Sequence, residues 1–148
     1  WSSERGLDWW MNDQPLHAGI GLEIHDLNRL YTQHPAFFEL DCDPAGFAWI
    51  DGADVTRNVV SFVRFDRAGN ALAVVANFSG SAHGDYVLGL PRAGEWAELF
   101  NSNAQQYGGS GVGNIGAVTA TDEGWNHLPA QALLTLPPLA VTYLYQAT

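Results

Sequence analysis

The fold is decided by the stretch VVSFVRFDRAGNALAVVANF, residues 59–78. Its first seven and last eight residues are mainly apolar, and valine and phenylalanine are prominent, as is typical of β-strands. Between them, residues 66–70 read DRAGN, and aspartate, glycine and asparagine favour turns. Two strand-like runs joined by such a turn predict a β-hairpin.

Short runs of the same kind continue toward the C-terminal end of the sequence. They are separated by glycine, proline, asparagine and aspartate, and they cover residues 86–90, 95–100, 132–136 and 139–145. Residues 115–121 also have the composition of a strand. Six or seven short strands at this spacing predict a mainly β fold, an antiparallel β-sandwich.

A different period governs residues 17–34. Ile20, Ile24, Leu27 and Tyr31 follow one another at steps of four, three and four residues. This spacing places the four side chains on one face of a helix. It is the one long helix that the sequence predicts.

The ends of this helix carry their own signals. Asp13 is the expected N-cap, with Pro15 shortly after it. Pro35 is expected to end the helix or to start a short turn through Phe37 and Phe38. A helix with a broad apolar face needs a covering surface, so we expect it to fold onto the chain's own sheet or to mediate dimerisation.

The charge balance excludes several classes of function. The 148 residues include six arginines, no lysine and 16 acidic residues, for a net charge of -10. Such a surface repels phosphate backbones and anionic lipid, so nucleic-acid and membrane-surface partners are not expected. Neither a transmembrane run nor a signal peptide is present, and the start at Trp1 without methionine indicates a cut or processed chain. The single cysteine, Cys42, excludes an internal disulfide and favours the cytoplasm.

A glycine-rich loop, GGSGVGN, occupies residues 108–114. A phosphate-binding loop should contain lysine and open a helix. This chain has no lysine, and the residues that follow have the composition of a strand. We therefore interpret the glycines as residues that supply positive φ angles and close backbone approach.

The histidines and carboxylates form no recognisable chemical motif. The histidines of the predicted helix lie eight and nine residues apart, which is not a metal-ligand spacing, so neither a metal site nor a cofactor is expected. The carboxylates show no catalytic pattern, and several are interpreted as turn formers. These are Asp51, Asp54, Asp66, Asp85 and Asp122.

The aromatic residues fall into two groups. Trp1, Trp9 and Trp10 lie in a polar stretch before the predicted helix, where they either stack on sugar rings or pack at a domain junction. Tyr107 and Trp125 are further candidates for exposure. The remaining large aromatics are predicted to lie in the sandwich core: Trp49, Phe62, Phe78, Trp96, Tyr143 and Tyr145.

Three segments carry a resemblance to a known family. Residues 39–51, ELDCDPAGFAWID, resemble the junction between barrel and C-terminal domain in glycogen (1,4-alpha-glucan) branching enzymes. Residues 101–114, with NSN at the start and YGGSGVGN at the end, are similar to a loop of the same family. Residues 136–140, LPPLA, match the start of its last strand and also occur in many amylase-type enzymes. The residues GLDW, 6–9, look like the segment after the eighth barrel strand.

The resemblance implies an architecture and a reaction. Branching enzymes carry a (β/α)8 barrel followed by a C-terminal β-sandwich, so residues 1–40 would be the barrel's last loop and helix and residues 41–148 the sandwich. The family cuts an α-1,4-glucan, holds the segment covalently and passes it to a 6-hydroxyl. Its catalytic acids lie on earlier barrel strands, so no catalytic residue is assigned in this chain.

The resemblance also indicates where glucan would be contacted. Barrel active sites form at the C-terminal ends of the strands. Asp8, Trp9 and Trp10, after the last strand, would therefore touch glucan at the rim. We expect a non-catalytic C-terminal fragment with α-glucan and the barrel as partners. Two alternatives remain open, an autonomous glucan-binding module and the tail of a related debranching or amylase-type hydrolase.

Overall fold

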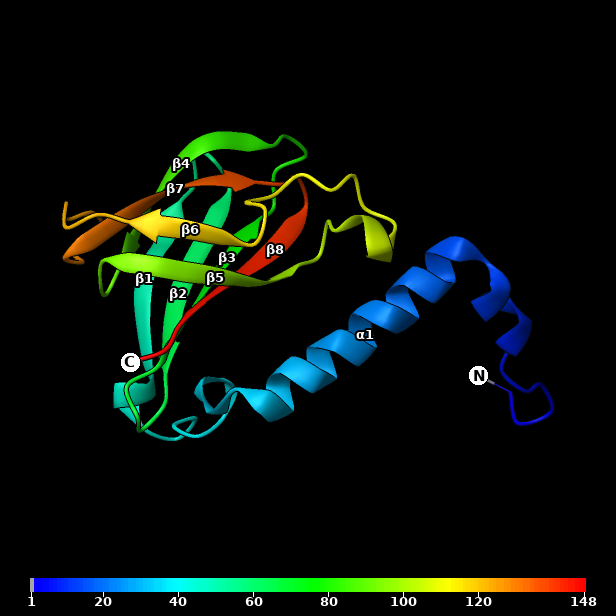
Figure 1. Ribbon diagram of the computed structural model, residues 1–148. Coiled ribbons are helices and arrows are strands. Elements are labelled where there is room, and N and C mark those ends of the chain that lie inside the picture. The colour runs from blue at the N-terminus through cyan, green and yellow to red at the C-terminus, as the bar shows by residue number, and fades with distance from the viewer. Residues whose placement is uncertain (1) are drawn as a thin grey trace.

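The computed structural model describes residues 2–148, so Trp1 lies outside the described residues. One long helix, α1 (Pro15–Gln33), precedes an all-β domain (Figure 1). The eight strands are β1 (Phe47–Asp54), β2 (Val59–Phe65), β3 (Ala71–Asn77), β4 (His83–Leu90), β5 (Gly94–Asn101), β6 (Ala117–Ala120), β7 (Ala130–Leu136) and β8 (Ala140–Gln146). Four short 3-10 helices are η1 (Trp9–Asp13), η2 (Pro35–Phe37), η3 (Pro44–Gly46) and η4 (Gln105–Tyr107).

The predicted hairpin is confirmed. Strands β2 and β3 pair antiparallel without a register shift, from Val59 opposite Asn77 to Phe65 opposite Ala71. Asp66 closes the turn, because its carboxylate accepts hydrogen bonds from the Asn70 backbone N–H at 2.9 Å and side-chain amide at 2.7 Å. The hairpin lies between edge strand β1 and strand β8 in the larger sheet.

The strands form two antiparallel sheets packed face to face. The larger sheet has the order β1-β2-β3-β8-β5-β6, and β4 and β7 form the smaller one (Figure 1). The sandwich is therefore confirmed, with eight strands rather than six or seven. Apolar side chains from both sheets fill the space between them, and the largest is Trp96, which is fully buried.

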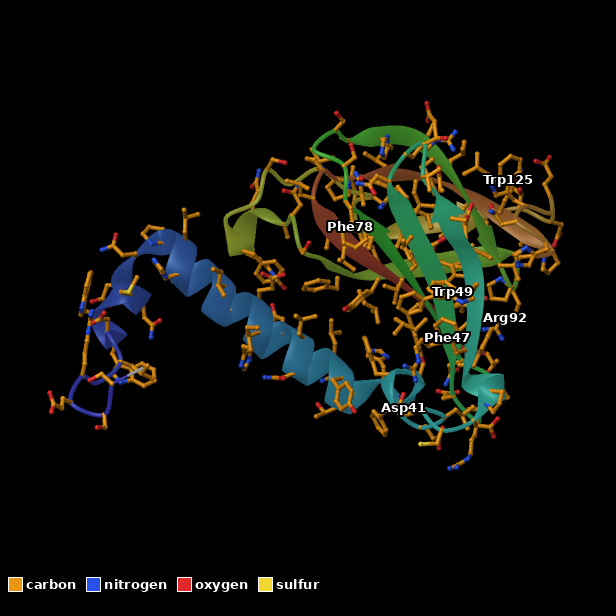
Figure 2. All side chains as sticks on the ribbon, turned by 180° about the vertical axis from the view of Figure 1, so that it is seen from behind. Asp41, Phe47, Trp49, Phe78, Arg92 and Trp125 are labelled. Carbon is orange, nitrogen blue, oxygen red and sulfur yellow. The ribbon has the colours of Figure 1, made fainter. Side chains whose placement is uncertain are left out.

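Of the six aromatic residues predicted to lie in the sandwich core, Trp96 does, whereas Trp49 and Phe78 are exposed. Trp96 is buried, and its indole N–H donates to the Arg92 carbonyl at 3.1 Å. Trp49 and Phe78 are 54% and 58% exposed. Trp49 alternates with the inward-facing Ile50 on edge strand β1, so its ring points to the outer face, and Phe78 lies just beyond the end of β3 (Figure 2).

The outer face of the larger sheet carries a second apolar cluster. Buried Leu72 and Val74 of β3 pack there with Ala36 of the η2 turn. Phe62, Tyr143 and Tyr145, which were predicted to be core residues, are partly buried against this cluster rather than between the sheets. The η2 turn begins at Pro35, as predicted, and provides the cover.

The helix ends differ slightly from the prediction. The N-cap of α1 is Gln14 rather than Asp13, because Asp13 ends the preceding turn η1 and Pro15 is the first helical residue. The segment between α1 and β1 is tied to β2 and its turn. Arg64 forms an ion pair with Asp41, and the Arg67 backbone N–H donates to the Glu39 carboxylate at 2.9 Å.

The glycine-rich loop has the geometry predicted for its glycines. Gly108 and Gly111 have φ angles of 92° and 80°, and a Cβ on Gly109 would lie 2.2 Å from the Asn103 carbonyl oxygen. The loop leads into β6 and not into a helix, so it lacks the helix that a phosphate loop requires. Within residues 2–148, no helix is long and apolar enough to cross a membrane.

Candidate functional site

The predicted glucan-contacting residues lie on the N-terminal arm, which comprises residues 2–14. Trp9 and Trp10 occupy the first turn of η1 and are 70% and 64% exposed. Asp8 caps this turn, and its carboxylate forms an ion pair with Arg5. The arm lies at the end of α1 farthest from the sandwich (Figure 1). The three residues are thus brought together by chain adjacency, on a surface where indole faces are free to stack.

Helix α1 meets the sandwich through its small and polar side. Gly19 lies against the backbone of Tyr107, and Asp26 accepts a hydrogen bond from the Tyr107 hydroxyl at 2.7 Å. Burial, followed by this bond to Asp26, raises the pKa of Tyr107, so the hydroxyl remains a donor. Tyr107 is therefore engaged in helix docking and is not an exposed platform.

The apolar side of α1 points elsewhere. We call Leu16, Ile20, Ile24 and Tyr31 the exposed stripe, because each is at least 49% exposed. Of the predicted face, Leu27 is half-buried, whereas Ile20, Ile24 and Tyr31 are not covered by the chain's own sheet. The docked residues Gly19 and Asp26 occupy a neighbouring face of the helix. Dimerisation through the exposed residues stays a prediction. An apolar stripe of this length is typical of a surface that contacts protein.

The C-terminal end of α1 is followed by a half-buried histidine, His34, whose protonation is expected to lower stability. The His34 ring lies 4.6 Å from the Tyr145 ring, and burial lowers the pKa of His34 from its usual 6.5. A base with a lowered pKa in the folded state binds fewer protons there than in the unfolded state, so stability falls as the pH drops below the unfolded value. We expect the thermal midpoint to decrease between pH 7.5 and 5.5, and less so in His34→Gln. An identical pH dependence in that variant would contradict this role.

A second candidate site lies at the opposite side of the sandwich. We define the end pocket by Asp51, Asp54, Arg57, Tyr86, Trp125 and Asn126, which line a cavity of about 360 Å³. Trp125, noted from the sequence as a turn tryptophan, is 49% exposed there. Figure 2 shows it on the far side of the molecule from α1.

The turn-forming role predicted for the carboxylates of this pocket is confirmed for Asp51 and Asp54. The Asp51 carboxylate accepts from the Ala53 backbone N–H at 2.8 Å, and that of Asp54 accepts from the Arg57 backbone N–H at 3.1 Å. Both residues also belong to β1, and Asp85 belongs to β4, because the two strands are irregular here. The register shifts between Trp49 and Asp51, and again before Asp54, so these carboxylates leave the regular alternation.

Two carboxylates of the pocket, Asp51 and Asp54, accept hydrogen bonds from distant side chains. Asp51 accepts from the Asn126 amide at 3.1 Å, although 75 residues separate the two in sequence. Asp54 accepts from the Tyr86 hydroxyl at 3.2 Å. Burial and the Asp54 carboxylate raise the pKa of Tyr86, which keeps that proton in place. Sequence reasoning missed this grouping, and Trp125 beside Asn126 in a predicted turn was its only signal.

Comparison with known proteins places the sandwich in a family. Residues 49–147 match the family model described as Alpha amylase, C-terminal all-beta domain. The chain belongs to this family. The alpha-amylase C-terminal all-beta domain begins within β1, so the match leaves out the N-terminal arm and α1.

Similarity to individual relatives extends over those residues as well. The chain is 52% identical over 97% of its length to the 1,4-alpha-glucan branching enzyme GlgB of Leifsonia xyli subsp. xyli. It is 50% identical over 93% to that of Rhodococcus jostii, and 48% identical over 99% to that of Mycobacterium tuberculosis. The chain spans about one fifth of the length of these relatives, because the matched residues make up 20%, 19% and 20% of the three proteins. The resemblance to branching enzymes seen in the sequence is thereby confirmed.

Proposed function

We propose that this chain is the C-terminal part of a 1,4-alpha-glucan branching enzyme and that it is structural and non-catalytic. The observation that carries the proposal is a sequence identity of 52% and 48% to two branching enzymes, over 97% and 99% of the chain. These alignments include α1. The enzyme's reaction is the transfer of an α-1,4-glucan segment to a 6-hydroxyl. The division proposed is residues 1–40 as the tail of the barrel and residues 41–148 as the sandwich.

The exposed stripe supports a buttressing role for the chain. Ile20 and Ile24 are 57% and 54% exposed, and burying each would contribute about 1.5–3 kcal/mol. We propose that the barrel covers them. Another face of α1 contacts Tyr107, and the η2 turn that follows the helix packs on the larger sheet. The helix would then contact the barrel on one face and the sandwich on the other.

The N-terminal arm is the proposed point of contact with glucan. Trp9 and Trp10 offer indole faces of the kind that stack on sugar rings, and Asp8 lies directly beside them. Their exposure at the outer end of α1 supports a place at the rim of the barrel (Figure 1). A cytoplasmic location goes with this proposal, in agreement with the single free cysteine, Cys42.

A chimera tests this function. The matching segment of the Mycobacterium tuberculosis branching enzyme is replaced by this chain, and branching of linear glucan is followed by iodine colour. We expect an active chimera, no branching by the 148-residue chain alone, and loss of activity and thermal stability in the chimera with Ile20→Asp and Ile24→Asp. The control is His25→Asp, an exposed helix position away from the stripe. Branching by the chain alone, or full tolerance of the stripe variant, would overturn the proposal.

The debranching or hydrolase alternative makes a different prediction. An active chimera that releases reducing ends from glucan without forming branch points would support it. The relatives named above are branching enzymes, which favours the branching assignment.

A further inference from the structure

The end pocket has the shape of a small-ligand site. Its volume of about 360 Å³ lies at the lower end of the range of roughly 300–1,000 Å³ that ligand cavities occupy. It opens between the end of β1, the start of β4 and the turn before β7. Three separate segments of the chain therefore meet around one cavity.

Trp125 is held rigidly at the wall of this pocket. Its backbone N–H and carbonyl both bond to Leu128, at 3.0 and 2.9 Å, and the two residues between have φ angles of 50° and 57°. This is the geometry of a two-residue hairpin with both central residues left-handed. The turn also packs on Gly89, where a Cβ would lie 2.3 Å from the Trp125 carbonyl oxygen. An aromatic ring on such a support presents a fixed stacking surface.

The facing wall is polar and carries both donors and acceptors. Asp51 and the Asn126 amide form one hydrogen-bonded pair, and Asp54 and the Tyr86 hydroxyl form another. The Arg57 guanidinium lies 5.6 Å from the centre of the Tyr86 ring and pairs with Asp54 at 3.4 Å, and its side chain is 58% exposed, which leaves other N–H groups for a ligand. A sugar hydroxyl both donates and accepts, so carboxylates, an amide and a guanidinium together match it.

The strands depart from regular pairing where the pocket forms. The register of β1 shifts between Trp49 and Asp51, and that of β4 shifts between His83 and Tyr86. Asp85, inside the second irregularity, has a φ angle of 53°. Irregularities of this kind re-aim side chains and are over-represented beside functional sites.

The charge of the pocket selects among ligands. Asp51, Asp54 and Asp85 outnumber the single cation Arg57 among the lining residues. An excess of carboxylates disfavours phosphate, sulfate and carboxylate ligands. In the part of the chain that the structure describes, no cluster of three or more His, Cys, Asp or Glu side chains could hold a metal ion. Among uncharged ligands, a polyhydroxyl compound matches the carboxylates, amide and guanidinium that line the pocket.

We propose that the end pocket binds a glucosyl residue of an α-glucan, stacked on Trp125 and hydrogen-bonded to the Asp51–Asn126 pair and to Arg57. The lining of the pocket matches a polyhydroxyl ligand, whereas the choice of an α-glucan rests on the proposed function. Trp125, which lines the pocket, lies on the far side of the sandwich from α1 (Figure 2). The pocket would therefore stay open when the stripe is covered, as a holding site for a glucan chain remote from the N-terminal arm.

Titration of the isotope-labelled 148-residue chain with maltopentaose tests this site. We expect shifts of the Trp125 indole N–H and of the Asn126 amide in the two-dimensional NMR spectrum at millimolar sugar. Trp125→Ala should weaken binding about tenfold or more. Asn126→Gly, which keeps the left-handed turn, should weaken it severalfold with the rest of the spectrum unchanged. The control is Trp49→Ala, a tryptophan of similar exposure on the outer face of β1.

The outcomes separate this site from the proposed function. Unchanged Trp125 and Asn126 resonances, or equal binding by Trp125→Ala, would overturn the pocket as a sugar site. Shifts confined to Trp9 and Trp10 would also overturn it. An active chimera without Trp125 shifts would overturn the pocket alone, whereas Trp125 shifts with an inactive chimera would overturn the proposed function alone.

Discussion

Replacing Trp96 with alanine is expected to lower the free energy of unfolding by about 3–5 kcal/mol. Trp96 is fully buried on β5, between the two sheets, and it is the largest fully buried side chain in the described residues. Its removal leaves a cavity that the surrounding strands of a sandwich fill only in part. It also leaves the Arg92 carbonyl without the 3.1 Å hydrogen bond from the indole. This loss is a large share of the total stability of a domain, which is about 5–15 kcal/mol.

The measurement is urea unfolding followed by far-UV circular dichroism, which does not depend on tryptophan emission. Trp49→Ala serves as the matched control, because the Trp49 side chain is 54% exposed and its ring packs edge-on against those of Phe47 and Phe62 on the outer face. We expect its cost to stay within about 1 kcal/mol. Equal costs for the two variants would show that the space between the sheets is not the stabilising core.

The contrast between these tryptophans shows where sequence reasoning succeeds and fails. The β2–β3 hairpin was predicted correctly because its information is local, in the two strand-forming runs of residues 59–78 and the turn that Asp66 closes. Whether an aromatic residue points inward depends on which sheet face is covered. For Trp49 that is decided by the position of β1 at the edge of the larger sheet, which no local pattern contains.

The candidate sites show the same difference between local sequence information and contacts that depend on the tertiary fold. Trp9 and Trp10 were found from the sequence because they are adjacent to each other. The end pocket was missed because Asp51 meets Asn126 across 75 residues and because the carboxylates leave the regular alternation at register shifts. Helical periodicity predicted α1 and its apolar stripe, but it did not predict that a different face, with Gly19 and Asp26, is the one that docks.

That docked face yields a second prediction with a large effect. Gly19→Ala is expected to detach α1 from the η4 turn, because the new Cβ would lie 2.4 Å from the Tyr107 carbonyl oxygen and 2.7 Å from its carbonyl carbon. Both contacts are backbone atoms, which cannot rotate away as a flexible side chain can. Overpacking of this kind costs about 1–3 kcal/mol, and helix displacement would also break the bond from Tyr107 to Asp26.

Gly21 provides a control within the same helix. A Cβ there has nothing within 4 Å, so Gly21→Ala should only gain the helix propensity of alanine, about 0.5–1 kcal/mol in favour of the helix. Amide hydrogen exchange distinguishes the two variants. We expect faster exchange throughout α1 in Gly19→Ala, slower exchange in Gly21→Ala, and unchanged protection of the sandwich strands in both. Slower exchange of α1 in both variants would mean that helix propensity, rather than contact with Tyr107, determines the stability of α1. Faster exchange of α1 in Gly19→Ala together with slower exchange in Gly21→Ala would show that close contact between Gly19 and Tyr107 docks α1 on the sandwich. This contact forms while the apolar stripe of the helix faces outward.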